Sequence, residues 1–414
     1  MNLRRTAAAL SRRISAAPAL FVLLLLLAPS AFAQAPPLYD APARITIKSA
    51  VLGEDRPILV RVPPGYERDG QRYPVLYMTD GDAHILHTSG TVAFLARNNR
   101  MPEMIVVGIP NTDRTRDLSP THPKQIPENP NFRTSGGGDK FLKFIETELI
   151  PHIEKEYRTQ PYRVLAGHSL GGLFAVHAML SRPELFNAYV AASPALFWDN
   201  FLLIDRAKEF FKNRKEYNRT LFVTLGNEPG DIGDAFKLFK EVLQKQQTAG
   251  FVWEAVEMTD EDHGSVVLRS HYAGLRKAFE GWQYPRDPNT GAIAGDFKAV
   301  EDHYRKLSDR LGFTLNPPEP LVNQVGYQLM GAGKMEEAIV ALKSNVERYP
   351  KSANVYDSLA EAYERSGKLD LARPGYEKAV AVGKETNDPN LKVFQTNLDR
   401  VTGLLSKSTT NEKK

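Results

Sequence analysis

The stretch RVLAGHSLGGLFAVHAML, residues 163–180, places Ser169 between glycines at positions 167 and 171. An apolar run precedes the serine and a helical pattern follows it, which is the setting in which a G-x-S-x-G motif forms a nucleophile elbow. Side chains two residues before and after the serine would collide in so tight a turn. The pattern therefore predicts that Ser169 is a nucleophile and that the backbone N–H of Leu170, at the helix start, stabilises an oxyanion. A glycine-rich turn with a solvent-facing serine is the alternative.

A serine hydroxyl is a weak nucleophile and needs a base within hydrogen-bond reach. His263, in TDEDHGSVV, follows the last predicted strand and precedes a helix, which is where the base belongs in the chain order Ser, acid, His. The acid should follow the preceding strand, where TLFVTLGNEPGDIGD offers Glu228 first and Asp231 second. It would fix the tautomer of His263 and stabilise the imidazolium. Asp231 has a second interpretation, because aspartate also favours a helix start.

The loop after the predicted strand YPVLYMTDG carries Asp80, Asp82, His84 and His87. The backbone N–H of Asp82 is the predicted second oxyanion donor. The four side chains would also permit a metal site, but their spacing does not select one metal geometry, and serine acyl transfer needs no metal. We therefore predict that His84 orders this loop or lines the substrate pocket, and we expect neither a metal nor a cofactor.

Strand and helix patterns alternate from about residue 36 to residue 282. The predicted strands are ARITIKSAVL, RPILVRVPPGY, YPVLYMTDG, MIVVGIP, YRVLAGHS, AYVAASPALFW, TLFVTLG and FVWEAVEM. Helical spacing of apolar residues is clear in FLKFIETELIPHIEKEY and in SVVLRSHYAGLRKAFEGW. Buried strands that alternate with helices indicate a mostly parallel sheet covered on both faces.

Beyond the turn-rich break YPRDPNTGAIAGD, residues 284–296, the chain is predicted to be helical. VGYQLMGAGKMEEAIVAL and LAEAYERSGKLDLARPGY start 34 residues apart, and Gly333 in the first aligns with Gly367 in the second. A 34-residue helix–turn–helix period resembles the tetratricopeptide repeat. Two copies are few for a free-standing stack, so we expect a helix at residues 297–311 or 391–405 to cap them, or the preceding domain to support them.

Residues 1–33 have the composition of a secretory signal peptide. Four arginines precede the short apolar core ALFVLLLLLA, and AFA at residues 31–33 matches a small-x-small cleavage site. A retained membrane anchor is the alternative, but the apolar core is short for a bilayer span. The sequence therefore predicts a periplasmic or secreted protein without a membrane contact after cleavage.

Charge and cysteine content narrow the functional classes. The chain has 53 basic and 49 acidic residues, and the four charged residues within 1–33 are all arginines, so the remainder is balanced. This balance argues against nucleic-acid binding. The chain has no cysteine, which excludes disulfides, zinc–thiolate sites and lipid attachment at a cleavage-site cysteine.

Several stretches resemble the family of α/β-hydrolases named Putative esterase. They are YMTDGDAH, VVGIPNTDRTRDLSPT, SGGGDKFLKFIETELIPHIEKEYR, GHSLGG and SPALFWD, and the resemblance extends from about residue 45 to residue 282. The family includes enterobactin-type siderophore esterases, S-formylglutathione hydrolases, feruloyl and acetyl-xylan esterases, and mycolyl-transferring antigens. The chain is most similar to the periplasmic siderophore-esterase-like branch.

The resemblance implies the same roles for Ser169, His263, Asp82 and Leu170 as the spacing does. The mycolyl-transferring members have a glutamate in a similar loop, which favours Glu228, whereas some siderophore-esterase-like members work with serine and histidine alone. The sequence as a whole predicts a signal peptide at 1–33, an α/β-hydrolase domain at 34–285, a linker with a helix at 286–320, tetratricopeptide-like repeats with a capping helix at 321–406 and a disordered tail at 407–414.

Three side chains are candidates for substrate binding: Arg114, Trp198 and His84. Arg114, in DRTRD, would bind an anionic substrate; alternatively, it and Arg116 pair with the aspartates of the same stretch to hold the loop. Trp198, in SPALFWD, and the preceding phenylalanine would line an acyl or aromatic pocket; alternatively, they pack in the core beneath the site.

These observations predict an exported serine esterase whose substrate is a small-molecule ester, with siderophore and carbohydrate esters as the candidate classes. Fold alone does not select among the substrates of such a family. Two alternatives stay open from the sequence. The first is a partner-binding protein that uses its repeats and keeps the hydrolase domain as a scaffold. The second is an acyltransferase that uses the same site with an alcohol in place of water.

Overall fold

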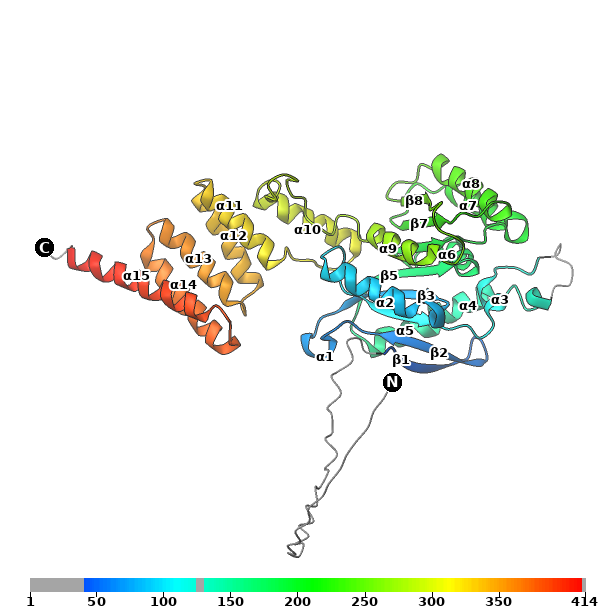
Figure 1. Ribbon diagram of the computed structural model, residues 1–414, viewed down its shortest axis with the longest axis horizontal. Coiled ribbons are helices and arrows are strands. Elements are labelled where there is room, and N and C mark those ends of the chain that lie inside the picture. Colours follow the sequence, from blue (N-terminus) through cyan, green and yellow to red (C-terminus); the bar gives the residue numbers. More distant parts are fainter. Residues whose placement is uncertain (1–40, 124–129, 412–414) are drawn as a thin grey trace, which may run out of the picture. The chain divides into compact units, whose positions relative to one another are not determined.

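Eight strands form one sheet in the order β1-β2-β4-β3-β5-β6-β7-β8 (Figure 1). The pairs β1–β2 and β2–β4 are antiparallel, and the others are parallel. The strands are β1 (Ala43–Ser49), β2 (Glu54–Arg61), β3 (Tyr73–Thr79), β4 (Ile105–Ile109), β5 (Thr159–His168), β6 (Ala188–Ala192), β7 (Thr220–Leu225) and β8 (Val252–Glu257). All eight strands predicted from the sequence are thus confirmed. This computed structural model describes residues 41–123 and 130–411, so the predicted signal peptide lies outside the described residues.

Helices cover both faces of the sheet. The helices of this part are α1 (Tyr66–Asp69), α2 (Gly81–Arg97), α3 (Arg114–Leu118), α4 (Gly138–Phe144), a π-helical turn (Ile145–Leu149), α5 (Ile150–Glu156), α6 (Leu170–Ser181), α7 (Trp198–Lys212), α8 (Asp231–Lys245) and α9 (Val266–Ala278), with a short 3₁₀ turn at Pro130–Phe132. Apolar residues of α4 to α8 pack on one face of the sheet, and those of α2 and α9 on the other. Strands β3, β4, β6 and β7 are buried along their whole length, as a parallel sheet with two covered faces requires.

The chain continues as a helical segment that repeats with a fixed period. Its helices are α10 (Phe297–Leu311), α11 (Glu319–Gly331), α12 (Met335–Arg348), α13 (Ala353–Arg365), α14 (Leu369–Thr386) and α15 (Leu391–Asn411). The starts of α13 and α14 follow those of α11 and α12 by the period seen in the sequence, and Gly333 and Gly367 end the first helix of each pair with φ of +74° and +73°. Helix α15 ends at Asn411, so residues 407–411 are helical where the sequence predicted disorder. No glycine or proline interrupts them, and the rest of that tail lies outside the described residues.

The helical segment shares a hydrophobic core with the sheet domain. One continuous cluster of buried residues contains Leu76 and Val106 of the sheet, Leu275 of α9, Leu307 of α10 and Leu342 of α12. The expectation that the preceding domain supports the repeat therefore agrees with the packing.

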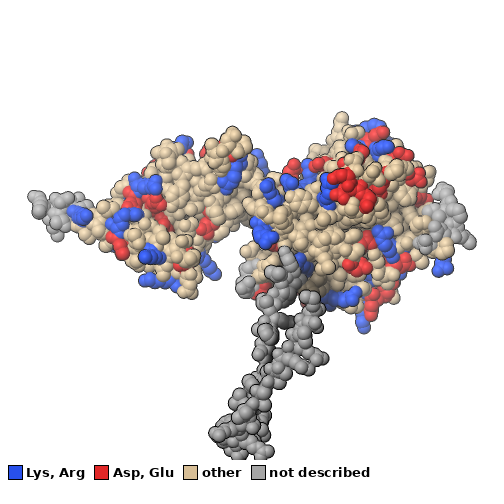
Figure 2. Space-filling model, in the orientation of Figure 1, with Lys and Arg blue, Asp and Glu red and all other residues tan. Residues whose placement is uncertain are grey.

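None of the helices within residues 41–123 and 130–411 is long and apolar enough to cross a membrane. Basic and acidic side chains both lie over the face in Figure 2, in keeping with the balance of charge outside residues 1–33.

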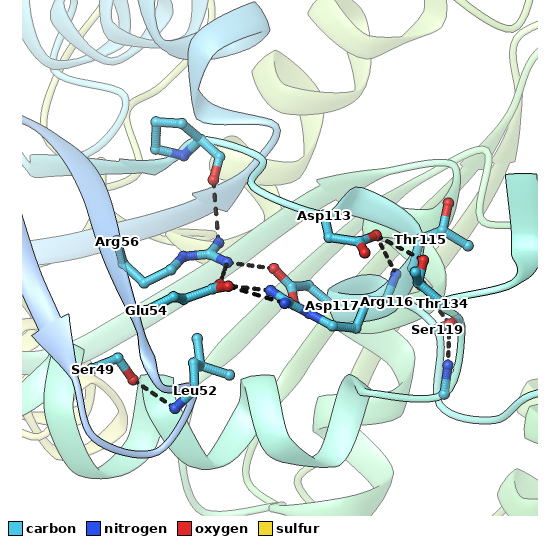
Figure 3. Close-up of polar contacts among 12 residues, drawn as sticks. Ser49, Leu52, Glu54, Arg56, Asp113, Thr115, Arg116, Asp117, Ser119 and Thr134 are labelled. Carbon is cyan, nitrogen blue, oxygen red and sulfur yellow. Dashed lines mark hydrogen bonds and ion pairs between the residues drawn. The ribbon is translucent and has the colours of Figure 1, made fainter.

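A buried ion network fixes the segment after β4 against strand β2 (Figure 3). The Arg56 guanidinium, 1% exposed, donates to Asp117 at 2.5 Å and to Glu54 at 2.9 Å. Arg116 donates to Asp117 at 2.7 Å and to Glu54 at 2.6 Å, and this bond lowers the pKa of Glu54. Asp113 accepts from the N–H of Arg116 and caps α3. The predicted pairing of Arg116 within DRTRD is thus confirmed, and the network holds the stretch that carries Arg114.

Asp117→Ala is expected to lower the free energy of unfolding by about 3 kcal/mol, because the buried Arg56 would lose the nearer of its two carboxylate partners and keep only Glu54. Chemical denaturation measures this change. Asp205→Ala is the matched control, since its pair with Lys208 is exposed, and its loss should stay below about 0.5 kcal/mol. Equal losses for the two variants would show that the network does not stabilise the fold.

Candidate active site

Ser169 lies at a sharp turn between strand β5 and helix α6. Its backbone has φ of 58° and ψ of −115°, a combination that an L-residue adopts only under strain. Such strain persists where the surrounding structure enforces it, and it is characteristic of nucleophile elbows. The N–H of Ser169 donates to the carbonyl of Ala192 in β6, and its carbonyl accepts from Leu173 and Ala195. These bonds hold the turn and place the half-buried serine at the carboxyl end of the sheet.

The glycines of the motif are required by contacts across the elbow. A Cβ added at Gly167 would lie 2.1 Å from the carbonyl oxygen of Gly171, and one at Gly171 would lie 2.2 Å from the Thr79 hydroxyl oxygen. The first of these atoms belongs to the backbone and cannot rotate away. The steric reason given for both glycines from the sequence agrees with these distances.

Gly167→Ala is expected to lower the free energy of unfolding by about 1–3 kcal/mol, as overpacking does, and to disturb the elbow. The matched control is Gly90→Ala in α2, where an added Cβ meets nothing within 4 Å. That variant should be stabilised by about 0.5–1 kcal/mol, because alanine favours a helix. Thermal denaturation of both proteins tests the contrast, and equal melting temperatures would contradict the steric argument.

His263 and Glu228 come from neighbouring loops and bond to each other. His263 lies between β8 and α9, and Glu228 between β7 and α8, so both sit at the sheet edge that carries Ser169. The Glu228 carboxylate accepts from Nδ1 of His263 at 2.5 Å. Its other oxygen accepts from the Ser193 hydroxyl at 2.5 Å and from the Gly226 N–H at 3.2 Å. Three donors thus fix the carboxylate of Glu228, whose side chain is 9% exposed.

This bond sets the protonation pattern of the imidazole. A carboxylate partner requires a proton on Nδ1, which leaves Nε2 of neutral His263 with a free lone pair, the form needed in a general base. The His263 side chain is 45% exposed, so the site is open to solvent. Asp231, the alternative acid, stands instead in the first turn of α8, where a negative charge suits the helix N-terminus.

Glu228→Gln is expected to reduce kcat for ester hydrolysis about 10²- to 10⁴-fold, because the amide no longer enforces the Nδ1–H tautomer. The expected change lies in kcat rather than in KM, since Glu228 is behind the imidazole. Asp231→Asn serves as the control and should keep activity within about twofold. Steady-state kinetics on a p-nitrophenyl ester measures both variants. A wild-type kcat for Glu228→Gln would show that Glu228 is not the acid.

The two predicted oxyanion donors occupy first turns of helices. Asp82 is the second residue of α2, and Leu170 is the first residue of α6. First-turn N–H groups have no partner within their own helix, and the helix dipole adds a partial positive charge there. Gly81 allows α2 to begin at this point, because a Cβ would lie 2.4 Å from the Gly108 carbonyl carbon. Both amides are therefore suited to a developing negative charge.

Arg114 does not pair with the aspartates of DRTRD. Its guanidinium donates to both carboxylate oxygens of Asp80, at 2.6 and 3.1 Å, and to the carbonyl of His168 at 3.2 Å. Asp80 is buried, has φ of 52°, and also accepts from the Asn111 amide. The expected partner is thus corrected, because the turn after β3 brings Asp80 closer than the neighbours in sequence. The Arg114 side chain remains 35% exposed beside the elbow.

Trp198 lies in the core rather than on the wall of the site. It is 3% exposed, its indole N–H donates to the Thr121 carbonyl, and its ring meets Phe132 edge-on at 5.4 Å. This corrects its assignment to substrate binding and matches the alternative left open from the sequence. Phe197, one residue earlier, is 39% exposed. Residues 199–201 have left-handed backbone angles, so the start of α7 is not a regular helix.

Histidines from four parts of the chain gather beside the elbow, which the sequence did not predict. The ring of His84 lies 5.2 Å from His87, 6.0 Å from His168 and 6.1 Å from His271, and the ring of His168 lies 4.5 Å from His263. Burial lowers the pKa of the first four, that of His168 to about 4. They are therefore neutral at pH 7.

The alternative of a metal site is not supported by this arrangement. Asp80 is engaged by Arg114 and Asn111, and within the described part of the chain no three His, Asp or Glu side chains converge as metal ligands would. His84 is half-buried, and its ring lies beside those of His87, His168 and His271. The spacing of these histidines along the chain could not predict that they lie together, because they come from α2, β5, α9 and a loop.

Comparison with known proteins places this chain among esterases. The profile of the family described as "Putative esterase" matches residues 49–230. The ferri-bacillibactin esterase of Bacillus subtilis (strain 168) is 30% identical over 220 residues, 47% of this chain and 75% of that protein. The siderophore enterobactin esterase of Emericella nidulans is 28% identical over 247 residues, 49% of this chain and 80% of that protein.

A solved structure resembles a larger part of the chain. The crystal structure of an IroE-like serine hydrolase from Shewanella oneidensis shares 29% identity with a TM-score of 0.63, and the match covers 74% of this chain and 99% of that one. Together with the sheet described above, these similarities establish an α/β-hydrolase fold followed by a helical segment.

Proposed function

The chain belongs to the Putative esterase family and is an ester-hydrolysing enzyme, and on this premise we propose that it is an exported serine esterase that acts on siderophore-type esters. The observation that carries the proposal is the His263–Glu228 pair at the sheet edge that presents Ser169. The names of the relatives support the substrate class. The composition of residues 1–33 supports export to the periplasm or beyond.

In the proposed reaction, the Ser169 oxygen attacks the ester carbonyl while Nε2 of His263 accepts the hydroxyl proton. The N–H groups of Asp82 and Leu170 stabilise the resulting oxyanion, and Glu228 stabilises the imidazolium. The imidazolium then protonates the leaving alcohol, which departs and leaves an acyl group on Ser169. A water molecule, deprotonated by the same imidazole, releases the carboxylic acid and restores the serine.

The site suits a bulky ester better than a small one buried in a closed pocket. The His263 ring is 45% exposed, and Phe197 stands exposed after β6, so a large substrate can reach the serine. We propose that Phe197 contacts an aromatic or acyl part of the substrate and that Arg114 and His84 shape the opposite side. Because Asp80 already neutralises Arg114, we assign that arginine to ordering the elbow first and to substrate contact second.

Activity profiling tests this proposal. The purified protein would be offered a triscatecholate trilactone, feruloyl and acetyl sugars, and p-nitrophenyl esters of increasing chain length, with Ser169→Ala alongside. We expect Ser169-dependent turnover, with the highest kcat/KM on the trilactone. Hydrolysis of sugar esters alone would move the substrate class to carbohydrates, and equal rates for wild type and Ser169→Ala would end the esterase mechanism.

Acyl transfer to an alcohol would use the same acyl-enzyme, and the exposure of His263 favours water as the acceptor. The ratio of free acid to glycerol ester formed in the presence of glycerol measures how the acyl group divides between water and an alcohol. We expect the free acid to dominate, and a majority of glycerol ester would identify a transferase.

The 34-residue period of α11 to α14 supports a second role in docking a partner through tetratricopeptide-like helices. We propose the division into a hydrolase domain at 34–285, a linker at 286–320 and repeats at 321–406. Tyr327 and Val340 are exposed on α11 and α12. A partner captured by the intact chain and lost by Tyr327→Ala or Val340→Asp, with esterase activity unchanged, would support docking. Capture that is insensitive to both changes would leave the segment a structural role.

A further inference from the structure

His168, the residue between Gly167 and Ser169, bonds to the backbone of the proposed base. Its Nε2–H donates to the carbonyl oxygen of His263 at 2.6 Å, and the two rings lie 4.5 Å apart. A carbonyl can only accept, so this bond requires the proton of neutral His168 to be on Nε2. The residue next to the nucleophile is therefore tied directly to the residue proposed to activate it.

The bond spans strands that are not neighbours. His168 ends β5 and His263 follows β8, with β6 and β7 between them in the sheet. Adjacent strands lie about 4.8 Å apart, so the two main chains are separated by roughly 14 Å at the sheet. The β8–α9 loop has other anchors: the Asn227 N–H donates to the Glu261 carbonyl, while Asp262 accepts locally from Gly264 and Ser265. None of these anchors holds residue 263 itself.

The surroundings of His168 keep its ring neutral. Burial, together with the nearby His263 ring, lowers the pKa of His168 to about 4, although the hydrogen bond to the His263 carbonyl acts in the opposite direction. The groups that face it are His84 of α2, whose ring lies 6.0 Å away, Asp80, and Arg114, which donates to the His168 carbonyl. Asp80 and Arg114 form an ion pair with each other. The wall beside His263 therefore carries no net positive charge at neutral pH.

We propose that His168 is a positioning residue for the ester hydrolysis assigned above: its uncharged imidazole holds the backbone of His263 in register with Ser169 and leaves room for the imidazolium that forms during the reaction. The inference rests on the proposed function. Glu228 fixes the orientation of the His263 ring, and His168 fixes the place from which that ring projects. A base displaced by about 1 Å can lose 10²-fold in rate, so this second anchor matters for catalysis.

Matched substitutions separate positioning from packing. The amide nitrogen of glutamine reaches the place of a histidine Nε2, whereas that of asparagine is one methylene short. We expect His168→Gln to keep kcat for p-nitrophenyl butyrate within about threefold of wild type, and His168→Asn and His168→Leu to lose at least tenfold. KM should change less than twofold in all three, since His168 is not proposed to touch substrate. His152→Leu on α5 is the remote control and should keep wild-type kcat.

A charged variant tests the second part of the proposal. His168→Lys would place a cation beside His263, disfavour its imidazolium and move the acid limb of the kcat/KM profile to lower pH, with a fall in kcat. His168→Gln should leave the acid limb in place. Besides His168, the groups that face the His263 imidazole are Glu228 and, through space, the Asp262 carboxylate of the same loop, and no variant changes either of them.

The outcomes distinguish this inference from the function on which it rests. If Ser169→Ala were as active as wild type, the proposed function itself would fail. If Ser169→Ala were inactive while His168→Leu kept wild-type kcat and pH profile, only the positioning role would be overturned. Equal losses for the glutamine and asparagine variants would also overturn it, because a packing role does not depend on the reach of the donor. The comparison of the two amides stands even if the leucine variant does not fold.

Discussion

Ser169→Ala is expected to abolish ester hydrolysis, with a fall in kcat of about 10³- to 10⁶-fold, the range that removal of a serine nucleophile produces in hydrolases of this mechanism. The reason is chemical: without the hydroxyl no acyl-enzyme forms, and only binding and the oxyanion donors remain. Steady-state kinetics on p-nitrophenyl butyrate and on a siderophore trilactone measures the loss. KM or substrate affinity should change little, because the deleted oxygen contributes mainly in the transition state.

Two further variants show that this loss is not a failure to fold. Ser181→Ala, at the far end of α6, removes a hydroxyl that bonds to His177 and should keep activity within about twofold. Ser169→Gly should be as inactive as the alanine variant but more stable than wild type by about 1 kcal/mol, because glycine adopts φ of 58° without strain. A glycine variant that retained activity, or an alanine variant with wild-type kcat, would contradict the nucleophile assignment.

His263→Gln carries the second large effect, and we expect kcat to fall about 10³- to 10⁶-fold. The glutamine amide reproduces the hydrogen bond from residue 263 to Glu228 only in part. It also has no basic nitrogen that could accept the serine proton. Because serine and histidine act as a unit, the double variant Ser169→Ala/His263→Gln should be no worse than either single variant. Additive losses would show that the two residues act independently.

His303→Gln on α10 is the matched control for this substitution. It lies outside the candidate site, is half-buried and packs on Tyr284 and Tyr304. Its activity should stay within about twofold of wild type. A comparable loss in this variant would attribute the effect of His263→Gln to global destabilisation, which thermal melting of both proteins would reveal.

The strands and the elbow could be predicted because their determinants are local. Short apolar runs bounded by turn residues predicted all eight strands, and the alternation with helices predicted a parallel sheet. The glycines at 167 and 171 reflect a clash within one turn, which spacing expresses directly. The chain order of Ser169, Glu228 and His263 also follows from topology, since successive loops meet at one sheet edge. For the same reason the predicted acid and the predicted base lie on neighbouring loops, where they bond to each other.

Contacts between side chains distant in sequence could not be predicted in the same way. Arg114 was expected to pair with neighbours in DRTRD, but the tight turn after β3 places Asp80 within 2.6 Å. Trp198 was assigned to the pocket wall, but it is buried by contacts with Thr121 and Phe132, which are distant in sequence. The bond from His168 to the His263 carbonyl depends on two intervening strands and on the loop after β8, which no local pattern expresses.

Covalent labelling can identify the nucleophile directly. A fluorophosphonate phosphonylates an activated serine with loss of fluoride. Trypsin does not cleave the Arg182–Pro183 bond, so cleavage after arginine yields a peptide of residues 164–206 that contains Ser169, Ser181 and Ser193. We expect one adduct per chain, located on Ser169 by fragmentation, absent in Ser169→Ala and formed much more slowly in His263→Gln. An adduct on another residue, or continued ester hydrolysis after Ser169 is fully labelled, would show that Ser169 is not the nucleophile.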